Sequence, residues 1–255
     1  KLRQLDLEGI LGRIRSRGVG VLYNGTVARQ IVEATAEAGG SLTLEDLRDY
    51  RPEWQATVVV PYGDDQIHFT QPPANAGLLM AQAWSMLEDE DRYEDTPADA
   101  RSHLLLEAIK RAYAQRSSYL DSQLSYTGGD LQKLATPAVA EALMRSYDSA
   151  RATPGSQLTG NQIVMENPGG TGMLVVDREG MAVACDFTLF NLFGTGRIAP
   201  GTGLVLAAAP GRNARNNLTL GPVMVTNPNT FVIRYASTAS GGRAKASSLL
   251  GVMAD

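Results

Sequence analysis

The stretch GGTGMLVVDREGMAVACDFTLFNLFGTG, residues 169–196, holds one threonine at the start of an apolar run and another near the end of the next run. The two runs flank a short polar turn that contains glycine, and this pattern predicts a β-hairpin. Threonine favours strands and glycine favours turns, so both residue types have a purely structural interpretation. The alternative is chemical: Thr171 would be a nucleophile at the start of a strand.

Before this hairpin, the spacing of the apolar residues is mainly that of helices. Residues 1–150 contain several such helical segments, interrupted by a predicted strand pair in ATVVVPYGDDQIHFT, residues 56–70. Residues 151–170 are rich in polar residues, glycine and proline, which predicts an exposed connector that is mobile over 151–169. Residues 171–255 carry strand patterns and end in a Gly-Gly turn followed by a helix.

A helical half, an exposed connector and a strand that starts with threonine are the layout expected of an N-terminal-nucleophile enzyme. A threonine hydroxyl is a weak nucleophile that needs a base, and its own α-amine can serve once the preceding peptide bond is cut. Cleavage between Gly170 and Thr171 would therefore need an accessible loop before the threonine and a rigid strand after it.

The composition narrows the classes of function that the chain can have. A net charge of −4 gives no electrostatic footprint for nucleic acid, and no apolar stretch reaches the roughly 18 residues of a membrane span. Lys1 opens into polar sequence without a signal peptide, so we expect a mature chain or a fragment, in the periplasm or the cytoplasm. The single cysteine, Cys185, excludes an internal disulfide. His68 and His103 lack metal-ligand spacing, so we expect packed or surface histidines.

Five segments follow one another over essentially the whole chain: YNGTVARQIVEATAEAGGSLTLEDLRDYRPEW, TQPPANAG, AYAQRSSYLDS, VVDREGMAVACDFTLFNLFGTG (residues 175–196) and STASGGRAK (residues 237–245). Together they resemble the γ-glutamyltranspeptidase family. The segment 175–196 is similar to the family signature VVDxxGNAVAxTxTxNxxFGTG, and 237–245 is similar to its GSPGGxR turn. TQPPANAG is similar to PPPSSGG, and AYAQRSSYLDS is similar to AYADRxxYLGD.

The resemblance implies an α+β fold, the four-layer αββα sandwich of N-terminal-nucleophile hydrolases, with a helical N-terminal half. It implies a large-subunit-like helical region (1–150), an exposed connector before the cleavage site (151–170) and a small-subunit-like β-rich region (171–255). It further implies an amidohydrolase or acyltransferase that cuts itself into a two-fragment heterodimer and acts on a small-molecule or peptide amide. It implies no metal and no organic cofactor.

The same resemblance assigns catalytic roles. Thr171 is the candidate nucleophile, Thr188 the threonine that hydrogen-bonds it, and Gly241 and Gly242 the amide donors of an oxyanion hole. If the chain hydrolyses amides, we expect both glycine amides to lie beside Thr171 Oγ. An ungapped count back from the VVD motif instead puts Gly170 at the nucleophile's position. Thr171 can therefore serve only if the strand start has lost one residue.

The residues that differ from the family's motifs lie mainly at positions that bind the substrate in the family. Phe190 replaces an asparagine, Arg212 stands at an aspartate position, and Leu218 and Thr219 replace two serines. We therefore expect a substrate that differs from simple γ-glutamyl compounds, larger or more anionic, or none at all. Arg212 also has a simpler interpretation as a surface arginine. The motif GTGRIAPGTG lacks the strand–turn–helix context of a phosphate loop.

Two functions stay open at this point. The first is an enzyme that self-cleaves between Gly170 and Thr171, and the second is a catalytically degenerate homologue that keeps the fold for binding or assembly. Asp186 shares a strand face with Thr188, and it is either an additional acid or a solvated residue at the strand end.

Overall fold

The computed structural model describes residues 3–121, 126–158, 170–209, 219–242 and 244–254. The chain forms two compact units: Lys1–Trp54 with Leu189–Pro210, and Gln55–Thr188 with Gly211–Asp255. The two units therefore do not follow the order of the sequence, because each of them combines an early segment with a late one.

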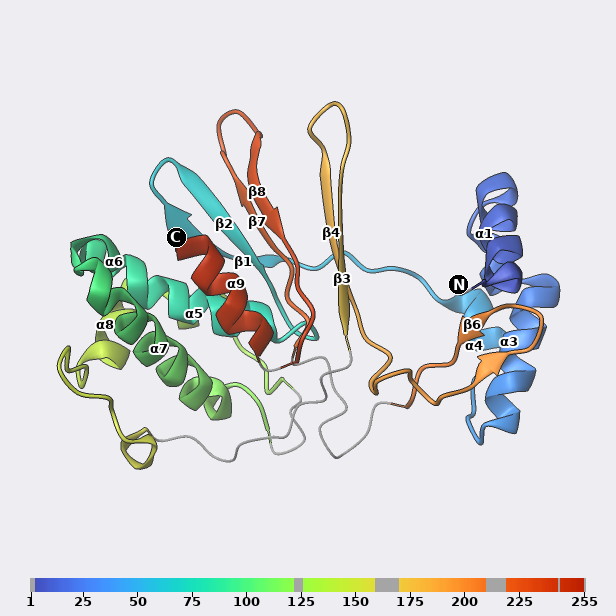
Figure 1. The fold of residues 1–255 in the computed structure, drawn as a ribbon, viewed down its shortest axis with the longest axis horizontal. Helices are drawn as coiled ribbons and strands as arrows, with labels where there is room; N and C mark the ends of the chain where they lie inside the picture. The colour runs from blue at the N-terminus through green and yellow to red at the C-terminus, as the bar shows by residue number, and fades with distance from the viewer. Residues whose placement is uncertain (1–2, 122–125, 159–169, 210–218, 243, 255) are drawn as a thin grey trace. The chain divides into compact units, whose positions relative to one another are not determined.

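The larger unit contains a four-stranded antiparallel sheet with the order β1-β2-β7-β8 (Figure 1). Its strands are β1 (Thr57–Tyr62), β2 (Asp65–Thr70), β7 (Val223–Thr226) and β8 (Ile233–Ser237). The hairpin of β1 and β2 comes from the predicted helical region, and β2 pairs with β7 from the predicted β-rich region. The predicted α+β class with a helical N-terminal half is confirmed.

Helix α5 (Ala76–Glu88) is the centre of the core in this unit. Its residues from Ala76 to Leu87 are all buried, because the helix is apolar on nearly every side. It packs on β1 and β2 and against α7 (Ala98–Gln115), α8 (Pro137–Met144) and α9 (Ala244–Ala254). Gly77 lies so close to β2 that an added Cβ would overlap the carbonyl oxygen of Thr70.

The larger unit has several short helices besides these. They are α6 (Arg92–Asp95) and the 3₁₀ turns Asp89–Asp91, Arg116–Ser118, Leu131–Ala135 and Gly155–Gln157. The smaller unit is built from α1 (Leu5–Arg17), α2 (Gly20–Tyr23), α3 (Gly25–Glu37), α4 (Leu44–Asp49), β5 (Ile198–Ala199) and β6 (Leu204–Val205). At α4 the side chain of Thr43 accepts from Asp46 N, and Asp46 accepts in return from Thr43 N, which is a capping box.

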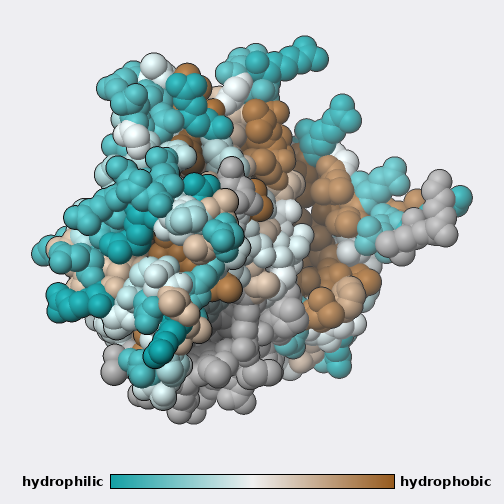
Figure 2. All heavy atoms as spheres, turned by 60° about the vertical axis from the view of Figure 1, so that its left-hand side comes forward, coloured by the Kyte–Doolittle hydropathy of each residue, from teal (hydrophilic) through white to brown (hydrophobic). Residues whose placement is uncertain are grey.

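The predicted hairpin is also present, as β3 (Thr171–Val176) and β4 (Ala182–Phe187). Its turn is stabilised by Asp177, whose carboxylate accepts from the amides of Glu179 and Met181. Apolar side chains on both faces are exposed, among them Val175 at 52%. Figure 2 shows that apolar side chains, in brown, reach the surface in patches on the face it draws.

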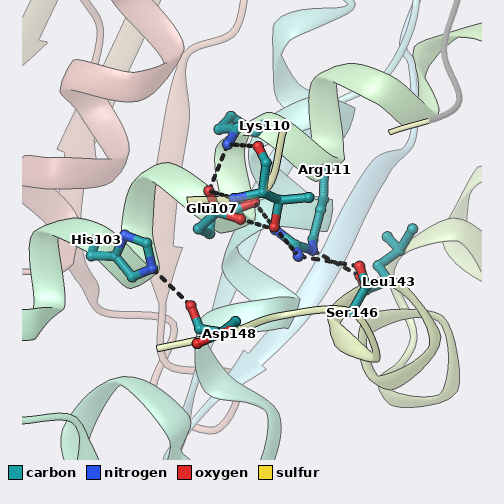
Figure 3. A network of polar contacts seen from close by, with 8 residues as sticks. His103, Glu107, Lys110, Arg111, Leu143, Ser146 and Asp148 are labelled. Carbon is teal, nitrogen blue, oxygen red and sulfur yellow. Dashed lines mark hydrogen bonds and ion pairs between the residues drawn. The ribbon is translucent and has the colours of Figure 1, made fainter. Parts of the chain in front are cut away.

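A buried polar network fixes the first part of the predicted connector (Figure 3). Glu107 on α7 accepts hydrogen bonds from Lys110 Nζ at 2.6 Å, from Arg111 at 2.5 Å and from the amide of Thr153 at 3.1 Å. Burial alone would raise the pKa of Glu107, but the hydrogen bonds from Lys110, Thr153 and Arg111 lower it to about 2. Arg111 also donates to Ser146 and to the hydroxyl of Thr153.

The predicted connector is described only in its first part. Thr153 is buried in the network, whereas most of residues 151–158 are exposed. Residues 159–169 lie outside the described residues.

Candidate active site at the start of β3

Thr171 is the first residue of β3, and it pairs with Phe187 at the end of β4. Both residues are exposed, and paired residues of two antiparallel strands share one face of the hairpin. A reagent in solvent can therefore reach the side of the hairpin that carries Thr171. Thr188, the next residue after β4, is half-buried.

Gly172 lies on the opposite face of the hairpin, because side chains alternate along a strand. It pairs with Asp186, and a Cβ added at Gly172 would overlap the side chain of Thr238. By the same alternation, Gly170 belongs to the Gly172 side. A Cβ at Gly170 would lie 3.3 Å from the carbonyl oxygen of Phe187, which is a tight contact. On this face, called the inner face below, Gly170 and Gly172 present only backbone, and Thr171 faces the other way.

Asp186 is the polar centre of that inner face. Its carboxylate accepts hydrogen bonds from Thr238 Oγ1 and Lys245 Nζ, and from the amide of Gly221 at 2.7 Å. The side chains of Asp186 and Lys245 are only 2% and 4% exposed. Burial lowers the pKa of Lys245, and the hydrogen bond and charge of Asp186 oppose that change. The interpretation of Asp186 as a solvated residue is therefore wrong.

The two candidate oxyanion glycines form the turn between β8 and α9. Gly241 and Gly242 have φ values of +119° and +61°, a backbone region that residues with a Cβ rarely adopt. Gly242 is buried, and its carbonyl accepts from the amide of Lys245 at 3.2 Å. The convergence of these two amides beside Thr171 Oγ stays a prediction.

The candidate recognition residues are distributed over different parts of the chain. Thr219 is buried in the larger unit, two residues before Gly221. Phe190 belongs to the smaller unit, where it is half-buried with a φ of +59°. Arg212 and Leu218 lie outside the described residues. The predicted roles of Phe190, Arg212 and Thr219 in substrate binding stay predictions.

Sequence reasoning missed Lys245, Thr238 and Gly221 as partners of Asp186. One signal was present, because Lys245 is the only charged residue in the helix AKASSLLGVMA, and a lysine is rarely buried unless it is paired. Thr238 and Gly221 gave no such signal, since threonine near a strand end and glycine in a turn are common.

The two histidines, predicted as packed or surface residues, are both half-buried and hydrogen-bonded. His68 on β2 bridges Thr57 Oγ1 at 3.1 Å and Thr226 Oγ1 at 2.9 Å, and burial lowers the pKa of its ring. His103 contacts the carbonyl oxygen of Asp148 at 3.0 Å (Figure 3). Within the described ranges, no group of three or more histidine, cysteine or acidic side chains is arranged to hold a metal ion. No helix in the described part of the chain is long and apolar enough to cross a membrane.

The sequence profile of the γ-glutamyltranspeptidase family matches residues 1–227. The chain belongs to the γ-glutamyltranspeptidase family. Within this family it is 32% identical to the glutathione hydrolase proenzyme of Escherichia coli, over 89% of this chain and 41% of the relative. It is also 28% identical to the oxamate amidohydrolase proenzyme of Klebsiella pneumoniae, over 95% of this chain and 47% of the relative.

Solved structures agree with this family assignment. The γ-glutamyltranspeptidase of Helicobacter pylori is 30% identical, with a TM-score of 0.52 over 61% of this chain and 45% of that one. A cephalosporin acylase from Bacillus halodurans has the same fold, with 22% identity and a TM-score of 0.75 over 98% of this chain and 46% of that one. The chain thus spans less than half the length of these relatives.

Proposed function

We propose that this chain belongs to an amidohydrolase or acyltransferase whose nucleophile is Thr171, freed by self-cleavage of the Gly170–Thr171 bond. Membership of the γ-glutamyltranspeptidase family supports amide chemistry. The single observation that carries the choice of residue is the position of Thr171, exposed and first in β3. A nucleophile of this kind needs solvent access and a strand behind it, and the exposed first position of β3 supports that choice.

The proposed reaction has two steps. Thr171 Oγ attacks the carbonyl carbon of the substrate amide, while the free α-amine of Thr171 takes the hydroxyl proton and passes it to the departing amine. The resulting ester is then cleaved by water, or by an acceptor amine in a transfer reaction, which releases the acyl group and restores the hydroxyl. Thr188 would position the hydroxyl, and the amides of Gly241 and Gly242 would stabilise the oxyanion.

We also propose that the substrate is not a simple γ-glutamyl compound. Phe190 and Arg212 stand where the resemblance expects an asparagine and an aspartate, so an acid that would hold an α-amino group is replaced by a cation. Related proteins are described as an oxamate amidohydrolase and a cephalosporin acylase, which shows that amides of other kinds are handled by similar chains. A larger or more anionic amide fits this chain better.

The assembly belongs to the same proposal. Relatives are described as proenzymes, and we propose that this protein too becomes a two-fragment heterodimer after the cut. We further propose that the whole protein completes the four-layer αββα sandwich, of which this chain supplies part.

A second candidate function is supported by one specific observation. The inner face at the strand start is lined by Gly170 and Gly172, and Thr171 alternates to the other face. If the reaction needs the inner face, the chain is a catalytically degenerate homologue that keeps the fold for binding or assembly.

Self-cleavage separates the two candidates. We expect the purified whole protein to give two fragments whose masses meet at the Gly170–Thr171 bond, with Thr171→Ala uncut and Thr171→Ser still cut. Intact-mass measurement after denaturation reads the junction directly. Thr195→Ala is a matched control, because it removes a threonine hydroxyl in the other unit and should leave the cut unchanged. One uncut chain, or cleavage that persists in Thr171→Ala, would refute the enzyme with this nucleophile.

A further inference from the structure

One carboxylate is bonded to both ends of the segment that contains the Gly-Gly turn. Thr238 directly follows β8, and Lys245 is the second residue of α9, with Gly241 and Gly242 between them. Both Thr238 and Lys245 donate to the buried carboxylate of Asp186 on β4. The two ends of the turn are therefore held at one point by a residue of the β3–β4 hairpin.

The first glycine of the turn is open on its side-chain face. Gly241 is exposed, and a Cβ built on it would meet no atom within 4 Å. Both glycines have positive φ and no side chain that could pack, so their amides depend on the flanking residues for direction. Thr238 and Lys245 are those flanking anchors.

The same carboxylate also reaches the strand that starts with Thr171. Asp186 pairs with Gly172, and the side chain of Thr238 fills the space where a Cβ of Gly172 would be. The strand start and the turn thus contact one another through Thr238. A displacement of Asp186 would move both of them.

A third segment is joined to the same point. The amide of Gly221 donates to Asp186, and Gly221 packs against the first turn of α5, where an added Cβ would lie 2.8 Å from Gly77 N. The carbonyl of Leu220 accepts from Ala76 N at 3.1 Å. Asp186 is in this way tied to the most buried helix of the unit.

We propose that the buried Asp186–Lys245 pair is a positioning device that aims the Gly241 and Gly242 amides at the start of β3. The proposal rests on the proposed function for its catalytic meaning, and it concerns Asp186 and Lys245 as positioning residues that act through the turn. A buried ion pair is a poor choice for stability alone, because apolar residues of similar volume often serve as well. What it adds is direction, since a carboxylate with several donors fixes where each donor points.

The test compares single and double variants of the whole protein. Asp186→Asn and Lys245→Met each leave one partner alone in a buried site, so both should melt at lower temperature. The double variant removes both charges and should recover most of that melting temperature. Lys133→Met is the matched control, because Lys133 forms an ion pair with Asp130 in which both side chains are largely exposed.

Hydrogen exchange at the turn gives a readout that does not depend on activity. In the double variant we expect the backbone amide of residue 245, which donates to the carbonyl of Gly242 across the turn, to exchange about tenfold faster or more, while β1 and β2 exchange as in the unaltered protein. Unchanged exchange at the turn in a double variant that folds would overturn the proposal. So would faster exchange spread evenly over the unit, because that is the result of a purely structural role.

Activity supplies the second readout, with oxamate as the amide probe. Where the unaltered protein hydrolyses it, the double variant should lose about 10²- to 10³-fold in kcat with KM nearly unchanged, since the oxyanion amides act in the transition state. Wild-type kcat in the double variant would overturn the proposal. If no variant, including the unaltered chain, cleaves itself or hydrolyses oxamate, the proposed function fails, while the exchange result still decides whether the pair aims the turn.

Discussion

Some single side chains are buried and held by several specific hydrogen bonds, and Glu107 is the clearest case. It is 1% exposed and holds Lys110, Arg111 and Thr153 together. The sequence shows a helix with mixed charges at this place and gives no sign that one of them is buried. Burial of a charge is decided by what packs over the helix, in this case the segment around Thr153, which is more than 40 residues further along the chain.

Glu107→Gln should strongly destabilise the larger unit at neutral pH. The change leaves Arg111 buried without a counter-charge, a situation that costs about 3–5 kcal/mol. Urea unfolding at pH 7 measures the loss. Glu45→Gln is the control, because Glu45 lies in an ion pair with Arg48 that is largely exposed, and its loss should leave the free energy of unfolding nearly unchanged.

The pH dependence of this effect has a definite sign. The folded pKa of Glu107, about 2, is lower than its ordinary value of 4.5, so its contribution is present above pH 4.5 and is lost as the pH falls towards 2. The difference in unfolding free energy between the unaltered chain and Glu107→Gln should therefore shrink between pH 4.5 and pH 2. A difference that stays constant over this range would contradict the assignment.

Recognition residues lead to a second prediction at this scale. Phe190 and Arg212 replace a polar and an acidic residue, so we expect little turnover of simple γ-glutamyl anilides. A colorimetric assay with γ-glutamyl-p-nitroanilide measures it, with a γ-glutamyltranspeptidase that hydrolyses this anilide as the positive control. Turnover comparable with that control would contradict the prediction about the substrate.

Secondary-structure elements were more accessible to sequence reasoning than single contacts. Thr43 followed three residues later by Asp46 is the pattern of a capped helix, and this helix is present, as are the strand pair within residues 56–70 and the hairpin after Gly170. The spacing of apolar residues also predicts a long helix over about 99–120, and the structure has α7 there, which ends at Gln115 and continues as a 3₁₀ turn. Local spacing and capping determine these elements, so they could be read from short stretches of sequence.

Longer-range pairings could not be read in this way. The run GLVLAAA has the pattern of a full strand, but only Leu204–Val205 forms one, as a short partner of Ile198–Ala199. The pairing of β2 with β7 joins residues about 160 positions apart, such as Gln66 and Thr226. The order of the strands in a sheet depends on which strand edges meet when the chain collapses, and no local sequence pattern encodes that order. The cluster around Asp186 was missed for the same reason.

Close packing of α5 on β2 gives a prediction at the level of elements. Gly77→Ala should destabilise the larger unit, by about 1–3 kcal/mol, because the new methyl group would overlap the backbone of Thr70. Gly251→Ala in α9 is the matched control, since a Cβ there meets only Leu105 at 3.8 Å. It should stabilise the helix by about 0.5–1 kcal/mol. Denaturant unfolding compares the two, and a neutral Gly77→Ala would show that the helix can shift away from the strand.

At the scale of the whole molecule, the family and the fold class could be predicted from the sequence, whereas the division into two units could not. The five resembling segments are short and ordered, and they lead to the same family as the sequence profile does. The two units nevertheless each combine distant segments, with Leu189–Pro210 joined to the first 54 residues. No change in composition marks these boundaries, because contacts rather than linkers define them.

The β3–β4 hairpin has a consequence for how the chain behaves in solution. Within the described residues β3 is hydrogen-bonded to β4 alone, and Met173, Leu174, Val175 and Val176 are each at least 43% exposed. An apolar strand with a free edge can recruit further strands, and a net charge of −4 over 255 residues opposes this only weakly. We expect this 255-residue chain by itself to be colloidally unstable, with light scattering that rises steeply with protein concentration and with salt. Val175→Lys should delay the onset without lowering the melting temperature, whereas Leu11→Lys, at an exposed apolar site on α1, should not.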